Sequence, residues 1–193
     1  YVNNEVGSVQ PIEEAVNIVK TYHPDILFHS DAVQGFGKYK IYPKRQKIDL
    51  LTGSGHKIHG PKGTGFLYIS EKVKIKPIVF GGEQQKNVRS GTENVPGIAG
   101  LGLAAKMIYQ DLEMKTALMR ELKSYFIEGI SKIENTTVHG LTDEQSAPHI
   151  ISVGFAGIRS EVLLHTLEDK GIYVSSGSAC ASNHPAISGV LKG

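Results

Sequence analysis

A short apolar run that passes directly into a glycine-rich turn is the feature that most constrains the fold of this chain. Residues 48–51 read Ile-Asp-Leu-Leu, as at the end of a buried strand, and the small-residue sequence TGSGHKIHGPKGTG follows. This turn carries Lys57 between two histidines. Glycine lets the backbone approach a ligand closely, and an amine there can trap a carbonyl group. From the turn alone, a solvated lysine or a phosphate contact is the commoner role.

A nucleotide-binding P-loop is the first alternative for this turn, and residue spacing tests it. That motif requires G-x-x-x-x-G-K-[ST], in which the lysine follows the second glycine and a hydroxyl residue comes next. Here Gly60 is followed by Pro61, Lys62 and Gly63. The register is wrong and no hydroxyl follows the lysine, so we do not expect a nucleotide-phosphate site.

A carboxylate after the preceding apolar run changes the interpretation of Lys57. Residues 25–29, DILFH, predict a short buried strand, and Asp31 follows it. Such a residue is ordinarily a helix N-cap or a surface charge. Pyridoxal phosphate, however, needs a carboxylate that keeps its ring nitrogen protonated, and Gln34 could donate to the phenolic oxygen of the ring. We interpret Lys57 as the lysine that holds pyridoxal phosphate as a Schiff base, with Asp31 as the partner of the ring.

Three further side chains are candidate phosphate contacts. Ser54 and His56 share the turn with Lys57, and exposed backbone N–H groups would assist them. Thr92 lies in the polar loop from Gly81 to Thr92, although a helix N-cap is an equally ordinary role for it. His56 and its neighbouring histidine could also be packed or solvated. We expect no metal site, because a third ligand is not supplied nearby.

Cys180 is the second point of chemistry. A single cysteine is more often a small buried hydrophobic residue than a nucleophile. Here small and polar residues surround it in the sequence SSGSACASNHP, as in an accessible loop where a thiolate can react. One cysteine also excludes an internal disulfide framework and fits a reducing compartment, so we expect a cytoplasmic protein.

The remaining pattern predicts an α/β protein with functional groups at the ends of strands. A helix is expected from Pro11 to about Thr21, and a long helix, or two with a bend near Asp111, from Val95 to Ile133. A further helix is predicted for residues 161–170. Strands are expected at residues 48–52, 65–69, 136–139, 149–155 and 172–174.

Composition narrows the possible partners. The net charge is +2 and the basic residues are spread along the chain, so nothing indicates nucleic acid or an anionic membrane. No apolar run approaches the roughly 20 residues that span a bilayer. The sequence starts at Tyr1 within a motif, and we expect that residues are missing upstream of it.

The order of the motifs resembles one enzyme family. NNEVG, DAVQ, SGHKIHGPKG, RSGTENVPG and SSGSACAS follow one another as in the cysteine desulfurases, and the resemblance covers essentially all 193 residues. It implies the aspartate-aminotransferase-like fold of pyridoxal-phosphate enzymes, fold type I, in a homodimer. Residues 1–108 would be the C-terminal part of the cofactor-binding large domain. Residues 109–193 would be most of the small α+β domain, which carries the cysteine loop.

The resemblance also implies a role for each matching residue. Lys57 corresponds to the Schiff-base lysine, and Cys180 to the cysteine that becomes a persulfide. The cofactor contacts would be Asp31 at the ring nitrogen, Gln34 at the ring hydroxyl, Ser54 and His56 at the phosphate, Thr92 at the phosphate across the dimer, and Asn4 near the cofactor and the substrate carboxylate. Arg89 is expected either to organise its loop or to touch substrate.

The expected activity is removal of sulfur from L-cysteine, which gives L-alanine and a persulfide that passes to an acceptor protein for iron–sulfur cluster assembly or tRNA thiolation. Alternatives with the same fold are a selenocysteine lyase and an aminotransferase. The family's N-terminal half and its C-terminal arginine have no counterpart in these residues. A non-catalytic piece that serves dimerisation or docks a scaffold protein is therefore a further alternative for this chain.

Overall fold

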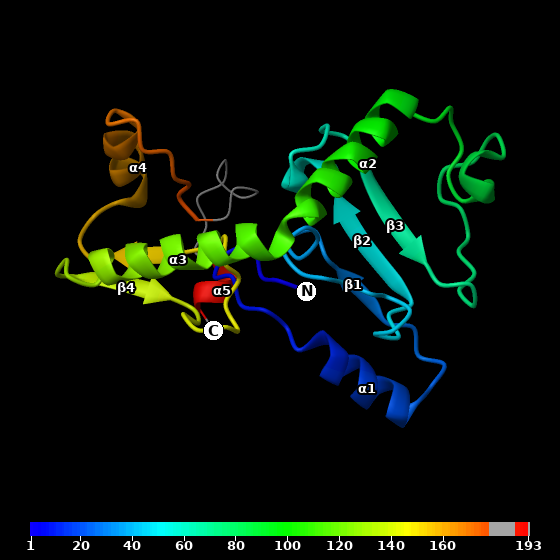
Figure 1. Cartoon of the computed structure of the whole chain (residues 1–193), viewed down its shortest axis with the longest axis horizontal. Coiled ribbons are helices and arrows are strands. Elements are labelled where there is room, and N and C mark those ends of the chain that lie inside the picture. The colour runs from blue at the N-terminus through cyan, green and yellow to red at the C-terminus, as the bar shows by residue number, and fades with distance from the viewer. Residues whose placement is uncertain (178–187, 193) are drawn as a thin grey trace. The chain divides into compact units, whose positions relative to one another are not determined.

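The computed structural model describes residues 1–177 and 188–192 (Figure 1). The chain divides into two compact units. The first unit contains Tyr1 and Pro11–Glu113, and the second contains Val2–Gln10 and Met114–Gly193. The assignment of residues 1–108 and 109–193 to a large and a small domain of a longer enzyme stays a prediction.

A helix and a small sheet build the first unit. Helix α1 (Ile12–Tyr22) begins after Pro11. It carries Glu13 and Glu14 in its first turn and Lys20 in its last, and these charges interact favourably with the helix dipole. Strands β1 (His29–Asp31), β2 (Leu50–Ser54) and β3 (Gly65–Ile69) follow. Strand β1 pairs with β2 in parallel, and β2 pairs with β3 antiparallel. The predicted helix and these two later strands are confirmed.

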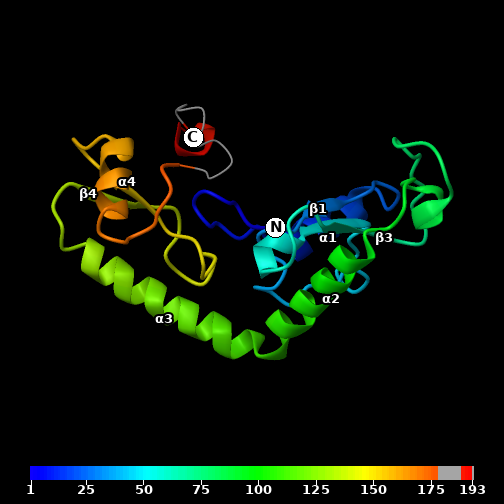
Figure 2. The same cartoon turned by 90° about the horizontal axis from the view of Figure 1, so that it is seen from above.

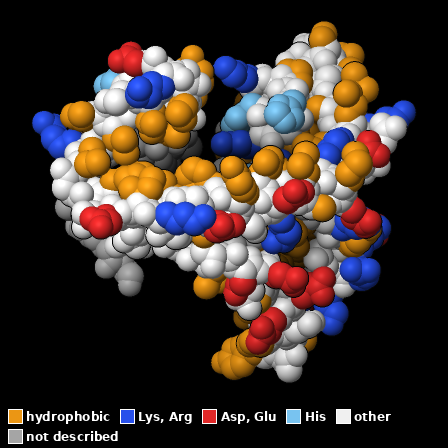
Figure 3. All heavy atoms as spheres, turned by 60° about the vertical axis from the view of Figure 1, so that its left-hand side comes forward, with side chains coloured by type: hydrophobic (Ala, Val, Ile, Leu, Met, Phe, Trp, Pro, Cys, Tyr) orange, Lys and Arg blue, Asp and Glu red, His pale blue; other side chains and the backbone are white. Residues whose placement is uncertain are grey.

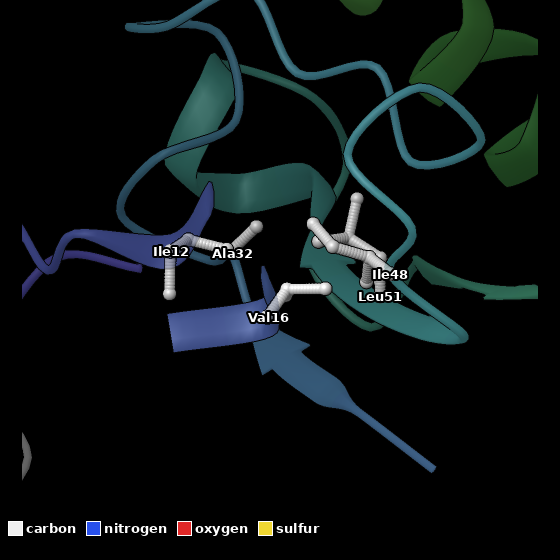
Figure 4. Close-up of a cluster of buried hydrophobic side chains, with 5 residues drawn as sticks. All are labelled: Ile12, Val16, Ala32, Ile48 and Leu51. Carbon is white, nitrogen blue, oxygen red and sulfur yellow. The ribbon is translucent and has the colours of Figure 1, made fainter. Parts of the chain in front are cut away.

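The core of the first unit lies between α1 and the sheet. Side chains from α1, from the turn after β1 and from the chain around β2 point toward one another in Figure 4: Ile12, Val16, Ala32, Ile48 and Leu51. All of them are buried, and Val16 and Ala32 expose nothing to solvent. Burial of a side chain such as valine, leucine or isoleucine contributes about 1.5–3 kcal/mol, so this cluster fixes α1 on the sheet.

Asp49 ties the parts of the first unit together, and it explains a wrong prediction. Its buried carboxylate pairs with Lys20 and Lys72 and accepts a hydrogen bond of 2.8 Å from the Phe28 N–H. Residues 25–28 were expected to be strand, but they lead into β1 as irregular chain. The Phe28 N–H is bound to this carboxylate rather than to a neighbouring strand, so the strand starts only at His29.

Helix α2 (Val95–Gln110) covers a short 3₁₀ helix, η1 (Gly55–Ile58), that follows β2 (Figures 1 and 2). The side chain of Asn94 caps α2 by accepting a hydrogen bond of 3.1 Å from the Gly97 N–H. A second short 3₁₀ helix, η2 (Gln84–Asn87), lies in the loop between β3 and α2. The predicted bend near Asp111 is confirmed, because α2 ends at Gln110 and α3 (Leu112–Ile130) begins at Leu112.

The second unit contains α3 and an antiparallel pair of strands, β4 (Thr136–His139) and β5 (Ser152–Phe155). Residues 2–10 join this unit through backbone hydrogen bonds, among them Ala147 N–H to the Gly7 carbonyl at 2.7 Å. The buried ammonium of Lys123 on α3 donates to the Ser146 hydroxyl and to the carbonyls of Ala147 and Ile150, at 2.8 and 2.7 Å for the carbonyls. A polar tether therefore links α3 to the loop before β5.

Helices α4 (Ser160–Glu168) and α5 (Gly189–Lys192) complete the described part of the second unit. The strand expected at residues 172–174 is not formed. Instead Gly171 turns the chain with a φ of 73°, and the Ile172 N–H donates to the Leu167 carbonyl. That bond closes the end of α4, so Ile172 is used as a helix cap rather than as a strand residue.

None of the described helices combines the length and the apolar character that crossing a bilayer requires.

Candidate active site

Two neighbouring strands deliver the predicted site residues to one edge of the sheet. Because β1 and β2 run parallel, their carboxyl ends lie at the same edge, and Asp31 stands opposite Thr52 in the register. Ser54 ends β2, and η1 follows at once with His56 and Lys57. The structure thus brings four predicted site residues to this edge: Asp31, Ser54, His56 and Lys57.

The turn that holds Lys57 is fixed by its backbone. The Gly60 N–H donates to the Gly55 carbonyl at 2.8 Å, and the Gly55 N–H donates to the Thr64 carbonyl at 2.9 Å. A Cβ atom at Gly55 would come within 2.6 Å of the Thr64 hydroxyl and 3.0 Å of the Pro61 carbonyl. Glycine is therefore required at position 55 to fold the turn this tightly.

The side chains of η1 divide into an anchor and a reactive group. Ile58 is 2% exposed and holds the turn to the interior of the first unit. Lys57 is partly exposed, and its ammonium makes no hydrogen bond or ion pair with the residues that the structure describes. A held backbone with an unengaged amine is the arrangement that a carbonyl-binding lysine needs.

The Asp31 carboxylate is oriented by its own turn. Its Oδ1 accepts a hydrogen bond of 2.8 Å from the Val33 N–H, and the buried Ala32 between them anchors the turn. Its Oδ2 has no hydrogen-bond partner within residues 1–177 and 188–192. One oxygen is held and the other is available, as a carboxylate that faces a protonated ring nitrogen would require.

Ser54 and His56 lie close together on the exposed side of the turn. The Ser54 hydroxyl and His56 Nδ1 are 2.7 Å apart, within hydrogen-bond distance. A hydroxyl and an imidazole on the first turn after a strand can both donate to a phosphate. Together with the amine of Lys57 and the carboxylate of Asp31, which accepts hydrogen bonds, they form a set of groups that fits pyridoxal phosphate.

The remaining predicted residues lie on other segments of the chain. Gln34 is half-buried in the turn after β1, and Asn4 is exposed in the segment that joins the second unit. Thr92 is exposed in the loop before α2. In that loop the Arg89 side chain donates to the Ser90 carbonyl, which agrees with a role in organising the loop. Cys180 lies outside the described residues.

The sequence motifs did not indicate His29 and Thr52, which lie on the same face of the sheet as Asp31. His29 and Asp31 are two positions apart on β1, as Thr52 and Ser54 are on β2, so each pair shares a face. His29 Nε2 and the Thr52 hydroxyl lie 3.3 Å apart. The sequence signal for His29 was its position two residues before Asp31, with the buried Ser30 between them.

Comparison with known proteins decides the family. The sequence model described as aminotransferase class-V matches residues 1–192. This chain belongs to the class-V aminotransferase family. Enzymes of this family depend on pyridoxal phosphate, the cofactor expected from Lys57 and Asp31.

Individual relatives are cysteine desulfurases. The cysteine desulfurase IscS of Methanosarcina thermophila is 44% identical over 191 residues, which are 99% of this chain and 46% of that protein. A solved NifS-like protein matches with a TM-score of 0.87 and 39% identity over 91% of this chain and 47% of its own. A structure described as SspA in complex with cysteine matches with a TM-score of 0.74 and 32% identity, over 99% of this chain and 52% of its own.

These matches confirm the resemblance to cysteine desulfurases and the fold type I class. The chain spans about half the length of the curated relatives it matches.

Proposed function

We propose that this chain forms the lysine-bearing part of a cysteine desulfurase that acts on L-cysteine with pyridoxal phosphate. The observation that carries this proposal is the shared edge of β1 and β2. There the unengaged amine of Lys57 follows one strand, and the half-held carboxylate of Asp31 ends the other. The cysteine bound to the related SspA protein supports the choice of substrate.

The chain's own side chains would bind the cofactor as follows. Lys57 holds it covalently through its amine, and Asp31 keeps the ring nitrogen protonated. Ser54, His56 and Thr92 bind the phosphate, while Gln34 donates to the ring oxygen and Asn4 lies near the substrate carboxylate. When bound, pyridoxal phosphate supplies an electron-withdrawing ring that makes the α-proton of an amino acid acidic.

Two side chains then act on the substrate. Lys57, released when the substrate amine takes its place, accepts the α-proton as a general base. The Cys180 thiolate attacks the sulfur of the substrate, a sulfur–sulfur bond forms, and the carbon–sulfur bond of the substrate breaks. One thiol and one L-cysteine thereby become one persulfide and one L-alanine, without an external oxidant or reductant.

The persulfide on Cys180 would pass to an acceptor protein for iron–sulfur cluster assembly or for tRNA thiolation. We expect the enzyme to work as a homodimer, since Thr92 would reach a phosphate bound by the partner. The reducing conditions that keep Cys180 as a thiol point to the cytoplasm.

Borohydride reduction after incubation with pyridoxal phosphate, followed by peptide mapping, tests the proposal. We expect the label on Lys57 and its loss in Lys57→Ala. Lys62→Ala is the matched control, because Lys62 is an exposed lysine five residues further along the same loop. Labelling that stays on the chain in Lys57→Ala would contradict the assignment. Labelling in the full natural polypeptide but not in these 193 residues would assign cofactor binding to the longer protein alone.

Cys180→Ala in the full natural polypeptide separates a desulfurase from an aminotransferase of the same fold. We expect Lys57 labelling to survive, while formation of alanine from cysteine and addition of one sulfur atom to the protein are lost. Transfer of an amino group that is unchanged in Cys180→Ala would favour the aminotransferase.

A further inference from the structure

We infer that His29 and Thr52 are positioning residues that hold the Asp31 carboxylate toward the ring nitrogen of the cofactor. This inference rests on the proposed function and names residues that the family resemblance did not supply. His29, Asp31 and Thr52 lie on one face at the carboxyl end of two paired strands.

The register brings the three side chains together. Asp31 and Thr52 are direct partners in the parallel ladder, so their side chains are neighbours on the same face. His29 precedes Asp31 by two residues on that face, and it leans across to Thr52, with its Nε2 at 3.3 Å from the Thr52 hydroxyl. Thr52 thus lies between the imidazole and the carboxylate.

A hydroxyl can accept one hydrogen bond and donate another. With His29 Nε2 as the donor, the hydroxyl proton of Thr52 is left for an acceptor on the same face. The carboxylate beside it belongs to Asp31, whose Oδ1 is already held by the Val33 N–H. The order His29, Thr52, Asp31 therefore leaves a donor beside the second carboxylate oxygen, which has no hydrogen-bond partner among the described residues, and we expect this bond to form when the carboxylate faces the ring.

The opposite side of the same strands shows why the arrangement is held firmly. Ser30 and Leu51, which alternate with these residues, are 3% and 3% exposed and face the interior. Neither strand can shift by one residue without exposing that buried set, so the polar face keeps its register.

Variants at Thr52 and His29 in the full natural polypeptide test this inference. Thr52→Val keeps the shape and removes the hydroxyl, whereas Thr52→Ser keeps the hydroxyl. His29→Leu removes the donor, whereas His29→Gln keeps an N–H near the position of Nε2. Thr21→Val and His23→Asn are matched controls, since both residues are exposed at the end of α1.

The readout is the affinity of the apoprotein for pyridoxal phosphate, measured by fluorescence titration, with the visible absorbance of the bound cofactor. We expect Thr52→Val and His29→Leu to weaken binding about fivefold, the effect of one lost hydrogen bond. Thr52→Ser, His29→Gln and both controls should stay within about twofold of the unchanged protein.

A cofactor analogue with carbon in place of the ring nitrogen separates positioning from simple packing. If the pair acts through Asp31, Thr52→Val weakens binding of pyridoxal phosphate but not of the analogue. Its effect also disappears in an Asp31→Asn background. Equal weakening of both ligands, or an effect that persists with Asp31→Asn, would overturn the inference.

Failure of the inference is distinguishable from failure of the proposed function. If Lys57 is labelled in the unchanged protein and Thr52→Val binds pyridoxal phosphate normally, the inference alone is wrong. If the unchanged protein is not labelled at Lys57, the proposed function is wrong and this inference is wrong with it.

Discussion

The first unit buries apolar side chains at its centre, whereas the second buries a lysine. Six apolar residues of Pro11–Glu113 that lie before α2 are less than a tenth exposed: Ile12, Val16, Ala32, Ile48, Leu51 and Ile58. Among the described residues of the second unit, the buried set includes Lys123, Ser146 and Ala147. Hydrophobic burial therefore dominates one unit, and hydrogen bonding to a charge is central to the other.

This difference matters for the site. Buried Ile58 anchors the turn that carries Lys57, and buried Leu51 anchors the strand that carries Thr52. The sheet edge with the candidate site is therefore part of a packed unit. In the second unit, three apolar side chains spaced four residues apart on α3 form a stripe that is exposed to solvent. They are Met114, Leu118 and Leu122, each more than half exposed. Hydrophobic side chains also gather on the face shown in Figure 3. Packing within the described residues leaves this stripe uncovered, so it adds little stability.

Replacement of Asp49 should have the largest effect on the comparison. Asp49→Ala leaves the ammonium of Lys20, 10% exposed, without its buried partner and frees the Phe28 N–H. Removal of one partner of a buried ion pair costs about 3–5 kcal/mol. We expect faster amide hydrogen exchange across the first unit, with little change in residues 114–177. Faster exchange of equal size in both units would contradict the separation.

Lys123→Met should be the converse test. The thioether cannot donate, so the Ser146 hydroxyl and two carbonyls lose their common donor. We expect a loss of about 1–3 kcal/mol, because burial of unpaired acceptors is partly offset by removal of a buried charge. Exchange should rise in residues 114–155 and not around Lys57. Lys132→Met is the control, because Lys132 is an exposed lysine just after the same helix.

The two units should also respond to pH in different pH ranges. Burial raises the pKa of the Asp49 carboxyl, but hydrogen bonds from Lys20, the Phe28 N–H and Lys72 outweigh it, so its pKa lies below the ordinary value. This contribution to stability is present above the unfolded pKa of about 3.9 and is lost as the pH falls through the lower folded pKa.

Lys123 acts in the same direction, but at alkaline pH. Burial, followed by the charge of Arg120, lowers the pKa of its ammonium. The unfolded chain then binds more protons between the folded pKa and about 10.4, so stability rises with pH in that window. Exchange-monitored unfolding should show the loss of the Asp49 contribution in acid in the first unit and a gain in the second unit at alkaline pH. Lys123→Met should abolish the gain.

Polar replacement of the α3 stripe should have the smallest effect. Leu118→Gln and Leu122→Gln remove side chains that are 55% and 57% exposed, and a surface change of this kind alters stability by less than about 0.5 kcal/mol. Thermal unfolding of the 193-residue chain should be unchanged, while its solubility rises, because an exposed apolar patch promotes association. A large loss of stability would show that the stripe is packed within the chain.

Local pattern was sufficient to predict much of the fold, and it named the four candidate site residues that the structure places at one edge of the sheet. The strand at 65–69, the strand at 136–139 and the bend at Asp111 agree with their predictions, because periodicity and breaker residues act over a few positions. The predictions failed where an acceptor outside a sheet took up a backbone N–H. Asp49 binds the Phe28 N–H, and the Leu167 carbonyl binds the Ile172 N–H, so each apolar run lost its strand.

The sequence by itself supplied the candidate site residues: Lys57 in a glycine-rich turn, and Asp31 after the preceding apolar run. The motifs also indicated the family, since their order along the chain can be read without a structure. Only the tertiary structure decided that Asp31 and Thr52 are partners, and that His29 reaches across to Thr52. Strand register depends on which faces are buried by residues far apart in the chain, and spacing within one segment does not contain that information.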